Sequence, residues 1–162
     1  MIECNICGSA AFLTYRGRPG EQCVRCGSKA RHRIAWEVYQ QHLLPLVKAR
    51  PNARVLHMAP EASLHSLLLP ALGSKYVTSD ASPERYPHAA CLKLFFPRDF
   101  DVFPDGYFDA ILHNHVLEHI PGHYGDHMRA FTRLLTAGGK MIFSIPGPYR
   151  GIDTVEGGEN LS

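Results

Sequence analysis

Two Cys-x-x-Cys pairs near the N-terminus carry the clearest chemical signal of the chain. The first pair is Cys4 and Cys7, the second is Cys23 and Cys26, and a glycine follows each pair. Two such turns supply four thiolates, which is the tetrahedral set that Zn²⁺ prefers. All four coordination positions would be filled by protein, so the ion would be structural and not catalytic. We therefore predict a small zinc ribbon over residues 1–31.

The alternatives for these cysteines are disulfide bonds or unrelated buried thiols. The N-terminus lacks a basic stretch followed by an apolar one, which a secretory signal would need. The sequence also contains no run of about 18 apolar residues, so we expect no membrane partner. A cytoplasmic protein is the expectation, and in that compartment paired cysteines hold metal more often than disulfides.

Basic side chains surround the cysteine pairs, and they allow two interpretations. They are Arg16, Arg18, Arg25, Lys29, Arg31 and Arg33. Such a cluster can bind nucleic acid. It can also offset the charge of a zinc tetrathiolate, and the scarcity of interleaved aromatic residues favours this second interpretation. The net charge of +2 does not decide between them.

Five histidines in the second half of the chain are further candidates for chemistry. They are His113, His115, His119, His123 and His127. On one helix, the last three would share a face and could hold a second metal, but Pro121-Gly122 interrupts such a helix. His115 and His119 are candidate general bases, because the pKa of a histidine lies near neutral pH.

Alternating strands and helices must position these residues. Apolar runs predict strands at 54–58, 75–79, within 90–96, at 108–115 and at 140–145. Leucines at helical spacing predict a helix that Gly73-Ser74 ends, and a second helix spans 123–136 before Gly138-Gly139. This order predicts an α/β fold with a Rossmann-like, mostly parallel sheet and ligands at the carboxyl ends of its strands.

A helix over 32–49 links the ribbon to the sheet, which gives three parts: residues 1–31, 32–52 and 53–162. Its apolar stripe consists of Ile34, Ala35, Val38, Tyr39, His42 and Leu43. Pro45 is expected to end or kink this helix. We interpret the helix as a packing element between the ribbon and the larger domain.

Four motifs together resemble the class I S-adenosylmethionine (SAM)-dependent methyltransferases. They are VLHMAPE (55–61), TSD (78–80), FDAILHNHVLEHIP (108–121) and RLLTAGGKMIFSIP (133–146). The ribbon, the segment CGSKARHR (26–33) and the VLHMAPE loop resemble a subgroup with a Cys-x-x-Cys ribbon and a VLHFAPE-type loop. The resemblance covers residues 53–147. It implies a methyltransferase that carries SAM as cofactor and a structural Zn²⁺.

The resemblance also implies which residues contact the cofactor. They are His57, Ala59, Pro60, Glu61, Asp80, Asp99, Asn114 and His115. Asp80 would accept hydrogen bonds from the ribose, and Asp99, or alternatively Asp101, would lie near the adenine. The family's Asp-x-Gly-x-Gly-x-Gly loop is absent, since its acidic position is His57 and its glycines are Ala59, Glu61 and Ser63. SAM has no phosphate to cradle, so we hypothesise that Glu61 pairs with its ammonium group instead.

Three functions fit these residues. The first is methyl transfer to an unidentified acceptor, for which we expect a small molecule. The second is a non-catalytic binding module, and the third is an RNA methyltransferase whose ribbon grips RNA. Family members usually have seven strands, so five strands suggest a C-terminally shortened fold whose exposed edge would favour a homodimer. The polar tail over 151–162 is expected to be a loop or disordered.

Overall fold

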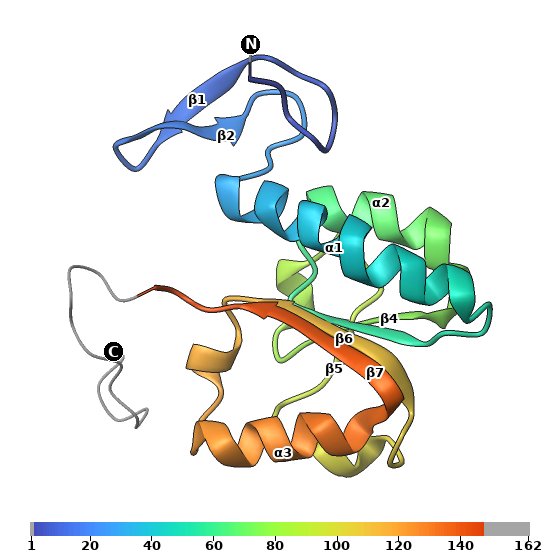
Figure 1. Ribbon diagram of the computed structural model, residues 1–162. Helices are drawn as coiled ribbons and strands as arrows, with labels where there is room; N and C mark the ends of the chain where they lie inside the picture. Colours follow the sequence, from blue (N-terminus) through green and yellow to red (C-terminus); the bar gives the residue numbers. More distant parts are fainter. Residues whose placement is uncertain (1, 148–162) are drawn as a thin grey trace.

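The computed structural model describes residues 2–147, so the expectation for the tail at 151–162 lies outside the described residues. Two units follow each other along the chain, a small antiparallel hairpin and a larger α/β unit (Figure 1). The strands are β1 (Phe12–Tyr15), β2 (Arg18–Cys23), β3 (Val55–Met58), β4 (Tyr76–Asp80), β5 (Leu92–Lys93), β6 (Phe108–Asn114) and β7 (Leu135–Ser144). The α-helices are α1 (Ala30–Ala49), α2 (Ala62–Leu72) and α3 (Tyr124–Leu134), and short 3₁₀ turns are η1 (Gly73–Lys75), η2 (Pro83–Arg85), η3 (Phe100–Val102) and η4 (Leu117–His119).

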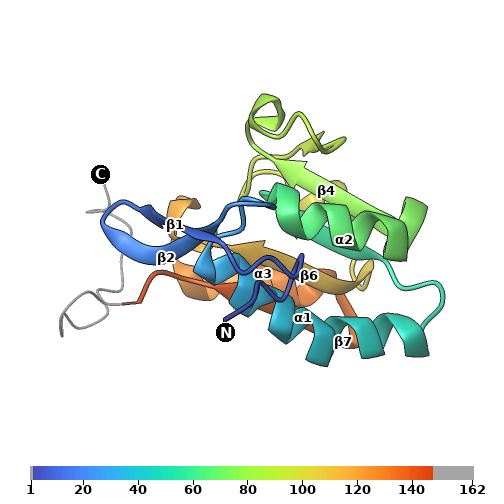
Figure 2. The same ribbon diagram turned by 90° about the horizontal axis from the view of Figure 1, so that it is seen from above.

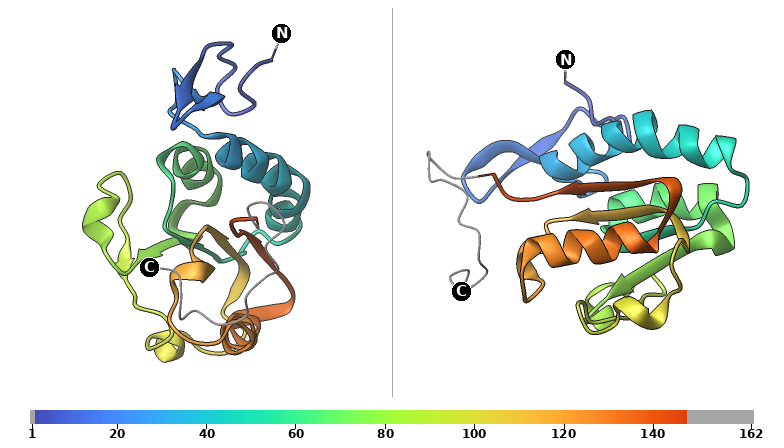
Figure 3. Two further views of the ribbon diagram at one scale, coloured as in Figure 1. Left: turned by 90° about the vertical axis from the view of Figure 1, so that its left-hand side faces the viewer. Right: turned by 60° about the horizontal axis from the view of Figure 1, so that its bottom comes forward.

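The larger unit is a sheet of five parallel strands between helices. The strand order is β5-β4-β3-β6-β7, and each neighbouring pair runs parallel. Helices α1 and α2 cover one face of the sheet and α3 covers the other (Figure 3). This arrangement confirms the predicted α/β fold with a Rossmann-like parallel sheet.

The central strand β3 is buried on both faces, as strands of parallel sheets usually are. Val55 packs with α1 and α2, whereas Leu56 and Met58 pack in the cluster on the α3 side. His57 also lies in this strand and is fully buried. A histidine at such a position needs polar partners, and these are the Tyr76 hydroxyl and the Glu61 carboxylate.

Helix α1 differs from its prediction in three ways. It begins at Ala30 and not at residue 32, and it continues through Pro45 to Ala49, so of the two predicted effects of Pro45, an end or a kink, the helix end is wrong. Apolar contacts on both sides of the proline, from Leu43 and Leu46, hold the helix together despite the missing hydrogen bond. The buried stripe is also narrower than expected, because Ile34 is 66% exposed and His42 is exposed too.

The connection between α3 and β7 is shorter than the sequence predicts. The helix ends at Leu134 and the strand begins at Leu135, not at residue 140. The two glycines of the expected turn, Gly138 and Gly139, lie inside β7. There the register with β6 shifts, between the pair Phe108–Leu135 and the pair Ala110–Lys140. At Gly139, a Cβ atom would lie 2.9 Å from a backbone oxygen of Thr136, so the bulge excludes larger residues.

The hairpin β1–β2 lies over the first turns of α1 (Figure 2). Arg33 of α1 fastens it there. Its Nη1 donates to the carbonyl oxygens of Glu21 at 3.1 Å and Ser28 at 2.9 Å, and its Nη2 donates to that of Gly20 at 3.1 Å. The hairpin and the start of α1 are therefore connected by directed hydrogen bonds.

Candidate functional site

The four paired cysteines come together in the hairpin unit. Their sulfur atoms all lie within 4.8 Å of one another. The Sγ atoms of Cys4 and Cys26 are 3.7 Å apart, and those of Cys7 and Cys23 are 3.6 Å apart. Four sulfurs at the usual Zn–S distance around one ion would be about 3.8 Å apart. The donor set and its spacing therefore fit a tetrahedral zinc ion.

The turns that carry the cysteines close as their glycines predict. The amide of Gly8 donates to Cys4 O at 2.7 Å and that of Gly27 to Cys23 O at 3.0 Å. Both glycines have positive φ angles, +74° and +68°. Burial raises the pKa of Cys4, but hydrogen bonds from the Ser28 side chain and from nearby backbone amides outweigh it and lower that pKa to about 6. The thiolate form that a metal requires is thus favoured for Cys4, whereas the pKa of Cys7, although lowered by a backbone hydrogen bond at Ser9, is raised overall to about 12 by burial and the neighbouring thiols.

A large cleft, called here the main cleft, opens at the carboxyl ends of β3, β4 and β6. Its volume is about 880 Å³, within the range of cofactor sites. The strand ends and the loops after them contribute Met58, Ala59, Glu61, Ser79, Asp80, Asn114 and His115. The hairpin and the start of α1 contribute a second wall, made of Tyr15, Arg16, Arg18, Lys29, Arg31 and His32.

Glu61 holds a central position in the main cleft, because three elements contact its carboxylate. His57 Nε2 from β3 lies 3.2 Å from Oε2, and Asn114 Nδ2 from β6 lies 3.5 Å from the same oxygen. His32 Nε2 from α1 lies 3.9 Å from Oε1. The carboxylate is thus placed beside position 57, where the methyltransferase motif usually has its acid.

The hydrogen bonds of His57 indicate that Glu61 is ionised. Burial raises the pKa of Tyr76, so its hydroxyl keeps its proton and can donate to His57 Nδ1, which lies 2.5 Å away. His57 Nε2 then carries a hydrogen and donates to Glu61. Burial also raises the pKa of Glu61, but the hydrogen bond from His57 and the electrostatic effects of His57 and His32 together lower it overall. The main cleft therefore contains a negatively charged carboxylate whose position is fixed by its contacts with His57 and Asn114.

Two backbone positions beside this carboxylate have left-handed geometry without being glycine. Ala59 has a φ angle of +50° and His115 one of +55°. Such conformations are costly for residues that carry a Cβ atom, and they concentrate at functional sites. The loop after β3 therefore adopts a tight turn without the glycines of the usual motif.

Of the other predicted cofactor residues, Asp80 lines the main cleft, whereas Pro60 and Asp99 are not among its lining residues. Asp80 lines the main cleft, and its Oδ1 accepts a hydrogen bond from the amide of Ser82 at 2.8 Å. Pro60 follows Ala59, and its carbonyl oxygen lies 2.8 Å from His88 Nε2. Asp99 lies outside the lining, where its carboxylate binds the Arg98 side chain and the amide of Phe95. Phe95 and Phe96 line the cleft instead.

The predicted histidine series separates in space. His115 and His119 line the main cleft, and Nδ1 of His115 is 3.5 Å from Glu118 Oε1. His113 and His127 are buried, and the ring nitrogens of both have no hydrogen-bond partner within residues 2–147. His119 belongs to η4, whereas α3 begins after His123, so the three histidines do not share one helix face. Among the described residues, only the four cysteines cluster as metal ligands do.

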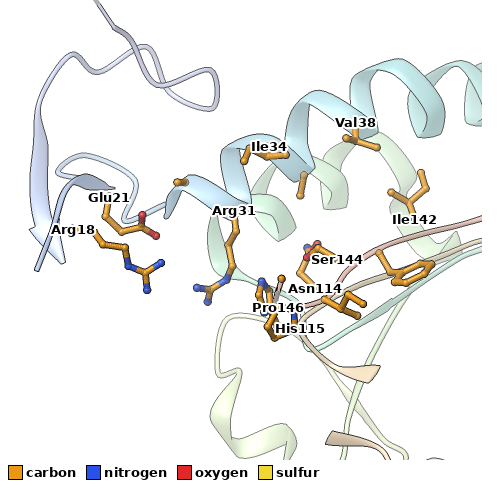
Figure 4. Close-up of a pocket in the computed structure, with 15 residues that line it drawn as sticks. Arg18, Glu21, Arg31, Ile34, Val38, Asn114, His115, Ile142, Ser144 and Pro146 are labelled. Carbon is orange, nitrogen blue, oxygen red and sulfur yellow. The ribbon is translucent and has the colours of Figure 1, made fainter. Parts of the chain in front are cut away.

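A second hollow, called here the side pocket, adjoins the main cleft and has a volume of about 690 Å³ (Figure 4). Both hollows share Arg18, Arg31, Asn114 and His115. The sequence did not indicate the side pocket, because its walls come from segments more than 100 residues apart, near Arg18 and Phe143. Nor did the sequence indicate that Tyr76 and His32 help to position Glu61, because tyrosines and histidines also occur in packed cores without such a role.

The comparisons with known proteins identify the family of the chain. A family model described as a methyltransferase domain matches residues 56–143, which is more than half of the chain. The chain therefore belongs to the methyltransferase domain family. No helix within residues 2–147 is long and apolar enough to cross a membrane.

Among solved structures, the chain is similar to one titled as the crystal structure of the trans-methyltransferase CalH in complex with SAH. The two share 16% sequence identity with a TM-score of 0.45, and the match covers 61% of this chain. It covers 33% of the CalH chain, so the present chain spans about a third of that protein's length. A search of curated proteins found no match.

Proposed function

We propose that this chain binds SAM in the main cleft and transfers its methyl group to an acceptor. One observation carries the proposal: the carboxylate of Glu61 lies beyond the carboxyl end of β3, 3.2 Å from His57 Nε2 and 3.5 Å from Asn114 Nδ2. A methionine ammonium group requires such an acid. Asp80, at the end of the neighbouring strand, is placed to accept hydrogen bonds from ribose hydroxyls.

The residues present fit the cofactor in a further respect. Ser79 lines the main cleft, and its Oγ atom is buried without a hydrogen-bond partner within residues 2–147. Buried hydroxyls normally have partners, and a bound polar ligand would supply one. SAM brings an activated methyl group, so the protein has mainly to position the acceptor in line with it.

SAM held by Glu61 and Asp80 would supply a methyl group to an oxygen, nitrogen or carbon atom of the acceptor, and its sulfur would keep the electron pair of the bond that breaks. If that atom carries a proton, a base or solvent must take it. His115 is the candidate base, because it lines both hollows and its Nδ1 lies near Glu118; His119, which lines the main cleft alone, is the alternative.

The proposal includes a structural zinc ion bound by Cys4, Cys7, Cys23 and Cys26. It also keeps the division into a ribbon (1–31), a connecting helix (32–52) and a methyltransferase domain (53–162). The ribbon has no open coordination position, so the zinc ion would shape the protein and take no part in methyl transfer.

Titration calorimetry with S-adenosylhomocysteine (SAH) and the zinc-loaded chain tests the proposal. We expect measurable binding to the unmodified chain, and a loss of about tenfold or more in affinity for Glu61→Gln, since a charge-assisted contact becomes neutral. Glu84→Gln is the matched control, because Glu84 is exposed in η2 and should leave the affinity unchanged.

Two results would contradict the proposal in different ways. Equal SAH affinity of the unmodified chain and Glu61→Gln would remove the role of Glu61. No heat of binding at millimolar SAH would show that the main cleft is not a cofactor site, which would favour the non-catalytic binding module.

A further inference from the structure

The side pocket combines an apolar wall with positive charge at one end. Its wall consists of side chains from α1 and β7, namely Ile34, Val38, Ile142, Phe143 and Ile145. Three of them are unusually accessible for large apolar residues: Ile34 is 66% exposed, Ile145 51% and Phe143 39%. Exposed apolar surface of this kind, gathered around a hollow, is typical of a ligand site.

Two arginines reach into the end of the side pocket that faces the hairpin. Arg18 extends from β2 and Arg31 from the first turn of α1, so they approach from two different units (Figure 4). Neither side chain forms an ion pair or a hydrogen bond within the part of the chain that the structure describes. Glu21 is the one acidic residue among the lining residues of the side pocket, and it makes no ion pair with either arginine.

Two neighbouring arginines, in contrast to Arg18 and Arg31, have hydrogen-bond partners in the hairpin unit. Arg33 donates to three carbonyl oxygens of the hairpin, and Arg25 donates to Cys7 O at 3.0 Å. Those two side chains hold the ribbon together. Arg18 and Arg31 contribute no such bond, although Arg31 Nε is buried and has no hydrogen-bond partner. A buried donor without a partner costs free energy unless a ligand satisfies it.

The position of Arg31 in α1 strengthens this conclusion. The first turn of α1 contains no acidic residue, and Arg31 lies in that turn. A cation at the positive end of the helix dipole is unfavourable, whereas an anion there would be stabilised by the free amides and by the dipole. An anionic group between Arg18 and Arg31 would reverse this unfavourable arrangement.

We infer that the side pocket binds the methyl acceptor, and that this acceptor is a small amphipathic molecule whose phosphate or carboxylate group lies between Arg18 and Arg31. The inference rests on the proposed function, because it uses the main cleft as the cofactor site. Asn114 and His115 line both hollows, so an acceptor in the side pocket lies beside the cofactor. The apolar wall favours a small molecule over RNA, whose backbone would need a charged groove.

Three probes with the same alkyl chain and different head groups test the inference. Hexyl phosphate, hexanoate and hexanol are titrated into the zinc-loaded chain saturated with SAH. We expect at least one of the two anions to bind and hexanol not to bind. Whichever anion binds more tightly identifies the head group. Arg18→Gln and Arg31→Gln should each weaken that binding about tenfold, as expected for loss of a charge-assisted hydrogen bond.

Lys48→Gln is the matched control, because Lys48 is an exposed cation in the last turn of the same helix. It should bind the anion as the unmodified chain does. Because both arginines also line the main cleft, the SAH affinity of each variant is measured separately, and each anion titration is made at an SAH concentration that saturates that variant. A fall in anion affinity under saturating SAH separates this inference from the proposed function.

Several outcomes would overturn the inference. If neither anion binds more tightly than hexanol while SAH still binds, the anion site does not exist. If Arg31→Gln weakens SAH and leaves the anion unaffected, the arginine serves the cofactor. If a single-stranded RNA oligonucleotide binds with a steep salt dependence that both arginine variants abolish, the partner is RNA. Absence of SAH binding to the unmodified chain would count against the proposed function as well.

Discussion

At the scale of single residues, His113 shows how burial sets the charge of a side chain. The ring is fully buried in β6, where it stacks against Phe143 with 5.0 Å between centroids and tilts against Phe131 at 5.9 Å. Neither ring nitrogen has a hydrogen-bond partner within residues 2–147. Burial lowers the pKa of His113 from 6.5 to about 4, so this histidine is neutral at physiological pH.

This pKa shift predicts a specific loss of stability in acid. The unfolded chain takes up the proton more readily than the folded one, so the contribution of His113 is complete above about pH 6.5 and is lost as the pH falls toward 4. Between pH 7 and 4.5 we expect the free energy of unfolding of the unmodified chain to fall by on the order of 2 kcal/mol more than that of His113→Phe. Urea denaturation at both pH values measures this difference; parallel losses in the two proteins would contradict it.

At the scale of elements, Asp109 connects four segments at the end of the sheet opposite the main cleft. Its Oδ1 accepts from Arg50 Nη1 at 2.7 Å and from Thr136 Oγ1 at 3.0 Å, and its Oδ2 accepts from the amide of Arg54 at 3.0 Å. Arg50 also donates to the carbonyl oxygen of Ala137 at 3.0 Å. Burial raises the pKa of Asp109, but the hydrogen bonds from Arg50, Arg54 and Thr136 lower it overall.

Replacing this aspartate should therefore affect stability and leave cofactor binding unchanged. We expect Asp109→Ala to reduce the free energy of unfolding by about 2 kcal/mol, since an arginine and a backbone amide lose their acceptor. Asp126→Ala is the control, because Asp126 pairs with Arg129 on the exposed surface, where ion pairs contribute little. Thermal unfolding and SAH calorimetry measure both effects; a reduced SAH affinity with intact stability would contradict this interpretation.

The same residue illustrates what the sequence could predict. The Phe108-Asp109 pattern identified the start of a strand and the family, but it did not indicate that the carboxylate binds Arg50. The order of strands and helices followed from local periodicity, and it is confirmed. The course of α1 through Pro45 and the contacts of its first turn with Glu61 depend on tertiary packing, which no local pattern encodes. For that reason, the helix was expected only to pack, whereas His32 and Arg31 also line the main cleft.

At the scale of the whole molecule, the hairpin unit and the start of α1 form one wall of the main cleft. Arg33 fastens the hairpin to α1, and Tyr15, Arg16 and Lys29 face the strand ends across the cleft. Lys29 Nζ lies 4.2 Å from the centre of the Tyr15 ring, which favours an ordered wall. The geometry of this wall therefore depends on the interaction that keeps the four cysteines in place.

We therefore expect that removal of zinc lowers both the stability of the hairpin unit and the affinity for SAH. Zinc contributes most of the folding free energy of such small modules. Chelation, or Cys26→Ser, should lower the melting temperature and reduce SAH affinity, measured by calorimetry alongside the zinc content. Cys91→Ser is the control, since Cys91 lies outside the cysteine cluster. Unchanged SAH affinity in a zinc-free protein would show that the wall does not need the ion.

The position of β3 in the sheet has a consequence for the chain as it leaves the ribosome. This strand pairs with β4 on one side and with β6 on the other, and β6 begins only at Phe108. Until residues 108–114 have been synthesised, the strand Val-Leu-His-Met at 55–58 has one unpaired, apolar edge. Pairing across such a sequence separation is slow. Nascent chains that end between β5 and β6 should therefore recruit chaperones, and release of the chaperone should follow the emergence of β6.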